Sequence, residues 1–127
     1  MQTTLTWGLL RNANGVLVPG GFGDRGIEGK VLAAQYAREN NVPYLGICLG
    51  LQVATIEFCR NVLGIEDATS TEFDADAANP AVIFMPEISK THLGGTMRLG
   101  SRPTIFQVEG CVTKRLYGGH DSVDERH

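Results

Sequence analysis

Short apolar runs alternate with helical periods through the first half of this 127-residue chain, and this alternation constrains the fold more than any other feature. The run Val16-Leu17-Val18, within residues 15–19, predicts a strand buried on both faces. Residues 43–47 predict a second strand. Strands that alternate with helices indicate a parallel sheet with right-handed crossovers. Ligands of such sheets bind beyond the carboxyl ends of the strands, so the loops at those ends are the candidate site.

Two helices are expected, one between these strands and one after them. The first begins near Ile27 and ends at the pair Asn40-Asn41, since asparagine suits a helix stop. The second follows Cys48 and ends at Gly64. Helical spacing predicts their apolar faces: Ile27, Val31, Ala34 and Ala37 on the first, and Leu49, Val53, Ile56, Cys59 and Leu63 on the second.

The second half of the chain is less regular. Residues 81–84, 96–99 and 104–108 read as short strands divided by Pro86, Gly94-Gly95 and Pro103. Residues 74–79 predict an exposed loop. We therefore expect one α/β domain over residues 1–127, a three-layer sandwich around a mostly parallel central sheet.

Composition excludes several classes of protein. A 43% hydrophobic and 20% charged composition is ordinary for a globular domain. The net charge of −3, with 11 scattered Lys and Arg residues, disfavours a nucleic-acid partner. No apolar run approaches the roughly 20 residues that span a bilayer, so we expect a cytoplasmic protein without a membrane partner. Three irregularly spaced cysteines fit neither a disulfide framework nor a zinc site, and we expect no metal.

The chemistry concentrates in residues 46–50, a G-x-C-x-G run where a strand meets a helix. Such a run is typical of a nucleophile elbow, with small residues on both sides of the sharp turn. Cys48 would lie over a helix N-terminus, whose amide hydrogens favour a thiolate. The Leu49 amide and the Gly21 amide of the neighbouring glycine loop would form an oxyanion hole. The alternative for Cys48 is a small buried thiol filling a turn.

The other cysteines have less support as nucleophiles. Cys59 lies on the apolar face of the second helix and is expected to pack in the core, while Cys111 belongs to no motif.

The glycine loop also permits a different function. Residues 21–26 read G-x-G-x-x-G after a strand and before a helix, so Gly21, Gly23 and Gly26 could hold a dinucleotide. That fingerprint also requires an acidic residue at the end of the second strand. Here that strand leads into Gly46-Ile47-Cys48, which has no acidic residue, and Glu39 falls in the last turn of the first helix, which weakens the alternative.

Four blocks of residues carry a resemblance that covers nearly the whole chain: residues 16–23 with Arg25-Gly26, residues 44–50, residues 70–73 and residues 94–100. The chain resembles the class I glutamine amidotransferase domain of the CTP synthase family, whose fold is flavodoxin-like. The first two blocks recur in several amidotransferases, and the last two are more specific to CTP synthases. The ending Glu125-Arg126-His127 resembles the opening of a basic segment of that family.

The resemblance implies a two-site reaction. This domain would cleave L-glutamine to glutamate and ammonia through a cysteine thioester, and a synthetase domain, absent from this chain, would use the ammonia to aminate ATP-activated UTP. No cofactor is implied here, because ATP and Mg²⁺ belong to the synthetase domain. A cytoplasmic homotetramer activated by GTP is also implied.

The resemblance assigns roles residue by residue. Cys48 is the nucleophile, and the residues of the oxyanion hole and glutamine pocket are Gly21, Leu49, Gly50, Leu51, Gln52 and Glu72. A carboxylate at Glu72 suits the α-ammonium group of glutamine, although residues 70–73 alone would read as a solvated loop. Arg98 falls in the lid region, where GTP binding is coupled to hydrolysis, and could equally be an exposed strand residue.

Departures from the family pattern matter for activity. Leu51 replaces a methionine, which conserves volume, and Thr69 replaces an asparagine. The family's base and its orienting acid come from a His-Pro-Glu motif, and no proline here follows a histidine. We therefore expect a partial domain, truncated at both ends and inactive alone. A non-catalytic interaction domain with the same fold is the remaining alternative.

Overall fold

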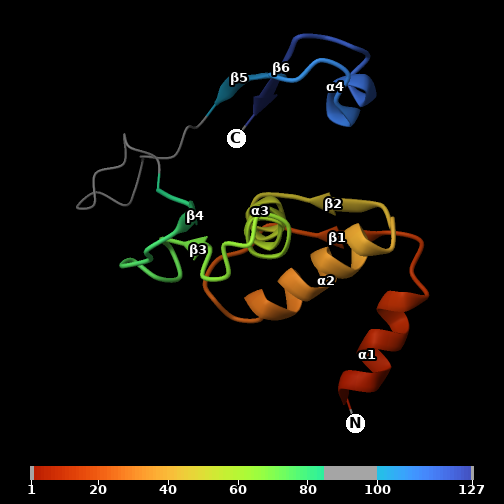
Figure 1. Ribbon diagram of the computed structural model, residues 1–127. Helices are drawn as coiled ribbons and strands as arrows, with labels where there is room; N and C mark the ends of the chain where they lie inside the picture. Colours follow the sequence, from red (N-terminus) through yellow and green to blue (C-terminus); the bar gives the residue numbers. More distant parts are fainter. Residues whose placement is uncertain (1, 85–99, 127) are drawn as a thin grey trace. The chain divides into compact units, whose positions relative to one another are not determined.

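The computed structural model describes residues 2–84 and 100–126. Residues 1–84 and 85–127 form two compact units, which are described separately. The first unit contains the α/β core and the candidate site (Figure 1).

The first unit has the expected strand-helix order. Strand β1 (Val16–Val18), helix α2 (Ile27–Glu39), strand β2 (Tyr44–Gly46) and helix α3 (Leu49–Asn61) follow one another along the chain. β1 and β2 pair in parallel, with Val16 opposite Tyr44 and Val18 opposite Gly46. Helix α2 ends at Glu39 with Asn40 as its C-cap, and Asn41 adopts a positive φ of 54°, as expected for an asparagine stop. The predicted α/β class with parallel strands is confirmed.

The core lies between α2 and α3. Its cluster of buried residues contains Ile27, Val31, Leu49, Val53 and Ile56, with Phe73, Ala81 and Val82 packed against it. All four apolar positions predicted for the first helix are buried. The prediction is only partly right for the second helix, because Cys59 is half-buried and Leu63 lies beyond α3 with 59% of its surface exposed.

The prediction that β1 is buried on both faces is wrong for this unit. Val18 is buried, but Leu17 on the opposite face is 59% exposed. Its register partner Leu45 is 55% exposed. Val18 lies on the side covered by the helices, because successive side chains of a strand point to opposite faces.

Two further elements complete the first unit. β3 (Thr69–Ser70) and β4 (Pro80–Val82) form a second parallel pair, with a register shift between Thr69 and Ser70. The loop between them, residues 74–79, is largely exposed, as predicted. Helix α1 (Gln2–Arg11) precedes β1, and no helix or strand was predicted for these residues.

The second unit contains a hairpin and a short helix. β5 (Ser101–Ile105) pairs antiparallel with β6 (Ser122–Arg126), and α4 (Val112–Leu116) lies between them in sequence. Pro103 does not divide two strands but lies inside β5, opposite Asp124. A two-stranded sheet tolerates proline because each strand has an outer edge where no amide donor is needed. The strand predicted at residues 96–99 lies outside the described residues.

The described helices are all too short or too polar to cross a membrane. Nor do the described residues bring three or more His, Cys, Asp or Glu side chains together as a set of metal ligands.

Candidate active site

Cys48 lies between β2 and α3 in a strained backbone conformation. Its φ of 53° and ψ of −108° are unusual for a residue with a side chain. Such conformations cost about 1–3 kcal/mol and persist where the surrounding structure enforces them, commonly at functional sites. Cys48 is also exposed, so the alternative of a buried thiol filling a turn does not hold. This is the geometry of the predicted nucleophile elbow.

The glycines of residues 46–50 are required by close packing. A Cβ at Gly46 would lie 2.5 Å from the carbonyl carbon of Gly50. A Cβ at Gly50 would overlap the Val18 carbonyl oxygen on β1. The turn therefore brings α3 directly against the end of the strand pair, and only glycine fits at both positions.

Some backbone amides at the start of α3 donate hydrogen bonds within the turn, whereas one has no acceptor in the described part of the chain. The Gly50 amide donates to Ile47, and the amides of Leu51 and Gln52 both donate to the carbonyl of Cys48. Neither Leu49 nor Gly21, the two predicted oxyanion donors, donates its amide to an acceptor within residues 2–84 and 100–126. Their amides are thus available for an anionic oxygen beside Cys48.

The glycine loop, residues 19–23, runs beside the nucleophile. A Cβ at Gly20 would lie 3.3 Å from the Cβ and 3.9 Å from the Sγ of Cys48. A Cβ at Gly21 would lie 3.4 Å from the Leu49 side chain. The fold therefore brings together the two loops that the sequence placed at the carboxyl ends of neighbouring strands.

Glu72 reaches the same loop from the second strand pair. Its Oε1 accepts a hydrogen bond from the Gly23 amide, with an N–O distance of 3.1 Å. Gly20 and Gly23 are three residues apart, so their Cα atoms are separated by at most about 11 Å. The structure thus brings Cys48, the two candidate amides and Glu72 around one short loop.

The other residues predicted for the site lie farther along α3, elsewhere in the chain or outside the described residues. Leu51 is 62% exposed on the first turn of α3, and Gln52 is half-buried one residue later. Arg98 and His92 lie outside the described residues, as does His127. His120 lies in the second unit, next to Gly118. Because the chain has only three histidines, residues 1–84 contain none.

Tyr44 stabilises the nucleophile turn through a hydrogen bond, a role that the sequence alone did not predict. Its hydroxyl donates to the Gly50 carbonyl, with an O–O distance of 2.8 Å. Burial raises the pKa of this phenol, so it stays protonated as a donor at neutral pH. The available signal was a polar aromatic residue at the start of a strand that leads into the elbow.

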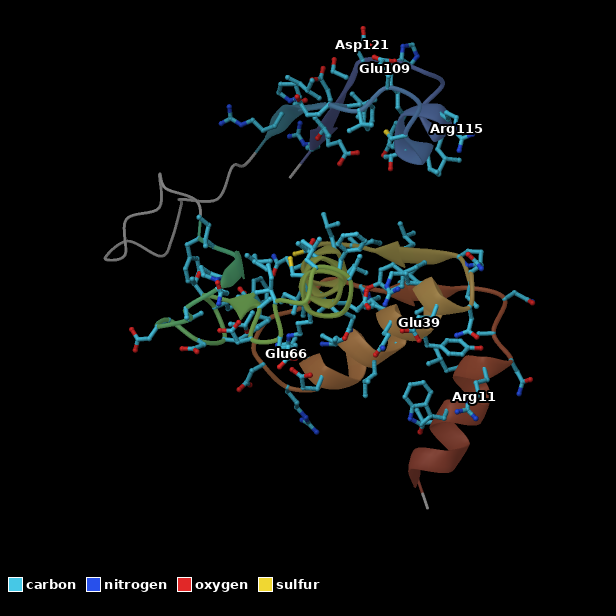
Figure 2. All side chains as sticks on the ribbon, viewed as in Figure 1. Arg11, Glu39, Glu66, Glu109, Arg115 and Asp121 are labelled. Atoms are coloured by element: carbon cyan, nitrogen blue, oxygen red, sulfur yellow. The ribbon has the colours of Figure 1, made fainter. Side chains whose placement is uncertain are left out.

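The dinucleotide alternative does not fit this geometry. A pyrophosphate would require the glycine-loop amides and the N-terminus of α2. Here the carboxylate of Glu72 occupies the Gly23 amide and would repel a second anion. Glu39 is the last residue of α2 and contacts Gln35 and Arg38 (Figure 2). It therefore does not lie at the end of β2, where the dinucleotide fingerprint requires its acidic residue.

The family assignment agrees with the site. The sequence model of the family described as "Glutamine amidotransferase class-I" matches residues 1–127. The chain therefore belongs to the class I glutamine amidotransferases.

The similar proteins are more specific. The chain is 58% identical over 125 residues to the CTP synthase of Candida glabrata, and this match covers 95% of this chain and 22% of that protein. It is 57% identical over 126 residues to the CTP synthase of Dictyostelium discoideum, and this match covers 96% of this chain and 22% of that protein.

A solved structure is similar over almost the whole chain. "Trypanosoma brucei CTPS - glutaminase domain with bound acivicin" has a TM-score of 0.87 and 40% sequence identity, covering 98% of this chain and 47% of that chain. The fold is thus that of a CTP synthase glutaminase domain. This chain spans less than half of that structure and about a fifth of its curated relatives.

Proposed function

We propose that this chain supplies the glutamine-hydrolysing site of a CTP synthase. The observation that carries the proposal is the strained, exposed Cys48 at the head of α3, beside the free amides of Gly21 and Leu49. The similarity to CTP synthases supports the identity of the whole protein.

The chemistry follows from the positions of these groups. The Cys48 thiolate attacks the side-chain amide carbon of glutamine, and the carbonyl oxygen becomes an oxyanion that the Gly21 and Leu49 amides stabilise. The amide nitrogen takes up a proton and leaves as ammonia when this intermediate collapses, and a glutamyl thioester remains on Cys48. Water then hydrolyses the thioester to glutamate. Glu72 binds the α-ammonium group of the substrate, as a carboxylate near the reacting thiol is suited to do.

The wider activity belongs to the same proposal. The ammonia passes to a synthetase domain that aminates UTP, with ATP and Mg²⁺ bound there and not by this chain. GTP activates the glutaminase site, with Arg98 as a regulatory contact. The protein acts as a cytoplasmic homotetramer.

One experiment separates the two half-reactions. In the full protein, Cys48→Ala is expected to abolish CTP formation from UTP, ATP and glutamine, while leaving CTP formation from UTP, ATP and ammonium chloride intact. Cys59→Ala is the matched control, because that thiol lies on the other end of α3. Glutamine-dependent synthesis by the Cys48 variant would refute the proposal. Loss of the ammonia-dependent reaction as well would assign Cys48 a structural role.

A further inference from the structure

Glu72 has a second contact that its proposed role as the ammonium receptor does not explain. Its Oε1 accepts a hydrogen bond from the backbone amide of Gly23, which is 49 residues away in sequence. We propose that Glu72 is also a positioning residue, which holds the glycine loop so that the Gly21 amide faces the oxyanion. This inference rests on the proposed glutaminase function and adds a role to that site.

The glycine loop has little else to hold it. Within residues 19–23, the Gly23 amide bond to Glu72 is the only hydrogen bond to another segment of the described chain. Three of these five residues are glycines, and Phe22 is 88% exposed. Glycine-rich backbone has more conformations to lose than any other, so a loop of this kind needs an external anchor to keep one geometry.

Glu72 itself projects from a well-fixed turn. The Thr71 amide donates to the Val82 carbonyl on β4, at 3.0 Å. The Glu72 amide donates to the hydroxyl of Ser70, which is 2% exposed. Phe73, the next residue, packs against the core cluster. The backbone of Glu72 is therefore fixed to the core. Its carboxylate, through the hydrogen bond from Gly23, restrains the glycine loop in turn.

The two roles of Glu72 require different properties of its side chain. Binding an ammonium group requires the negative charge. Anchoring Gly23 requires only an oxygen acceptor, which the side-chain amide of glutamine also has. Glu72→Gln should therefore lose the first role and keep the second, while Glu72→Ala should lose both.

A substrate without an ammonium group isolates the anchoring role. In the full protein, p-nitrophenyl butyrate would acylate Cys48: Sγ bonds to the ester carbon, the thiol proton goes to solvent, and the C–O bond breaks to release p-nitrophenolate with its electron pair. The tetrahedral intermediate needs the oxyanion amides, but the ester has no group for Glu72 to bind. The rate of the Cys48-dependent burst is the measurement, after subtraction of the rate of Cys48→Ala.

We expect Glu72→Ala to slow this burst about 10-fold, since a misplaced oxyanion donor forfeits part of a 10²–10³-fold effect. Glu72→Gln should restore the burst to within about twofold of the unmutated protein. Glu66→Ala is the charge-matched control, because Glu66 is an exposed acid in the loop between α3 and β3 and should leave the burst unchanged (Figure 2). With glutamine, the alanine variant should lower kcat and raise KM, whereas the glutamine variant should mainly raise KM.

Amide hydrogen exchange gives an independent measurement of the anchor. The Gly23 amide should exchange faster in Glu72→Ala and remain protected in Glu72→Gln. Equal burst rates in all three proteins, or equal slowing in both Glu72 variants, would overturn the positioning role while leaving Cys48 as the nucleophile. A burst that does not depend on Cys48 would overturn the proposed glutaminase function and this inference together.

Discussion

Gly50 shows how a single residue makes the nucleophile turn possible. A side chain there would collide with the Val18 carbonyl oxygen, which belongs to the strand pair and cannot move without disturbing β1. At the residue scale, the glycines of the elbow are therefore required by sterics and not by flexibility.

We expect Gly50→Ala to destabilise the first unit by about 2–4 kcal/mol, because overpacking against fixed backbone forces the helix start to shift. Reaction of Cys48 with electrophiles that mimic glutamine should fall in parallel. Gly29→Ala is the matched control: Gly29 lies in α2, and a Cβ there would meet no atom of another segment within 4 Å, so alanine should stabilise the helix by about 0.5–1 kcal/mol. Urea unfolding of both variants tests this, and equal stabilities would show that the elbow can relax around a methyl group.

At the element scale, helices α2 and α3 are joined by an ion pair in which Glu57 is buried and Arg38 is partly exposed. Arg38 on α2 donates to both carboxylate oxygens of Glu57 on α3, with Nη2–Oε1 2.7 Å and Nε–Oε2 3.0 Å. Asn61 donates to the same carboxylate. The pair lines a pocket of about 190 Å³ together with Tyr44 and apolar residues of α2 and α3. The ion pair therefore holds α3, which begins directly after Cys48, against α2.

The pH dependence of this contact has a defined direction. Burial favours the neutral form of Glu57, but hydrogen bonds from Arg38 and Asn61 and the Arg38 charge outweigh it and hold the pKa of Glu57 below its ordinary value of 4.5. A carboxyl whose folded pKa is lowered contributes stability that is present above about pH 4.5 and is lost as pH falls through the folded pKa.

We expect Glu57→Gln to lower the free energy of unfolding by about 1–3 kcal/mol at pH 7, because the charge-assisted hydrogen bonds are replaced by weaker ones. The difference from the unmutated protein should shrink as pH is lowered below 4.5. Denaturant unfolding at pH 7 and at successively lower pH values measures both effects. Glu66→Gln serves as the exposed control, and a gap that stayed constant with pH would remove Glu57 from the titrating groups.

At the scale of the whole chain, the structure contains two units, and the second is held together by its own contacts. In residues 100–126, Lys114 is buried and pairs with Glu109 and Asp121, at 2.7 Å and 2.6 Å. Tyr117 packs on Phe106 and donates to Glu125. These contacts stabilise the hairpin and α4 within their own unit, so each unit contains its own network of polar interactions.

The distribution of histidines across the molecule leads to a prediction about turnover. The unit that holds Cys48 contains no histidine, and thioester hydrolysis needs a group that moves protons. A protein limited to these 127 residues is therefore expected to form a Cys48 adduct with an electrophilic glutamine analogue, but to release glutamate at least about 10²-fold more slowly than the full protein.

Peptide mapping of the adduct and a glutamate-release assay measure the two steps. Label on Cys59 or Cys111 in place of Cys48 would contradict the nucleophile assignment. Turnover equal to that of the full protein, and lost in His120→Ala, would identify His120 as the missing base.

Local sequence was sufficient wherever neighbouring residues decide the structure. Helix α2 and its buried positions followed from apolar spacing, and the elbow followed from the glycines around Cys48, because periodicity and steric fit act over a few residues. The class of protein also followed, through the resemblance of four short blocks.

Tertiary structure decided what depends on residues far apart in the chain. The exposure of Leu17 reflects which face of β1 the helices cover, and Pro103 is accommodated because its strand has a free edge. Glu57 reads as an ordinary polar helix position, yet it is 2% exposed because Arg38 reaches it from another helix. The contact of Glu72 with Gly23 joins two loops that are 49 residues apart. No local pattern encodes such a contact, since only the packing of the strand pairs around α3 brings the two loops within hydrogen-bonding distance.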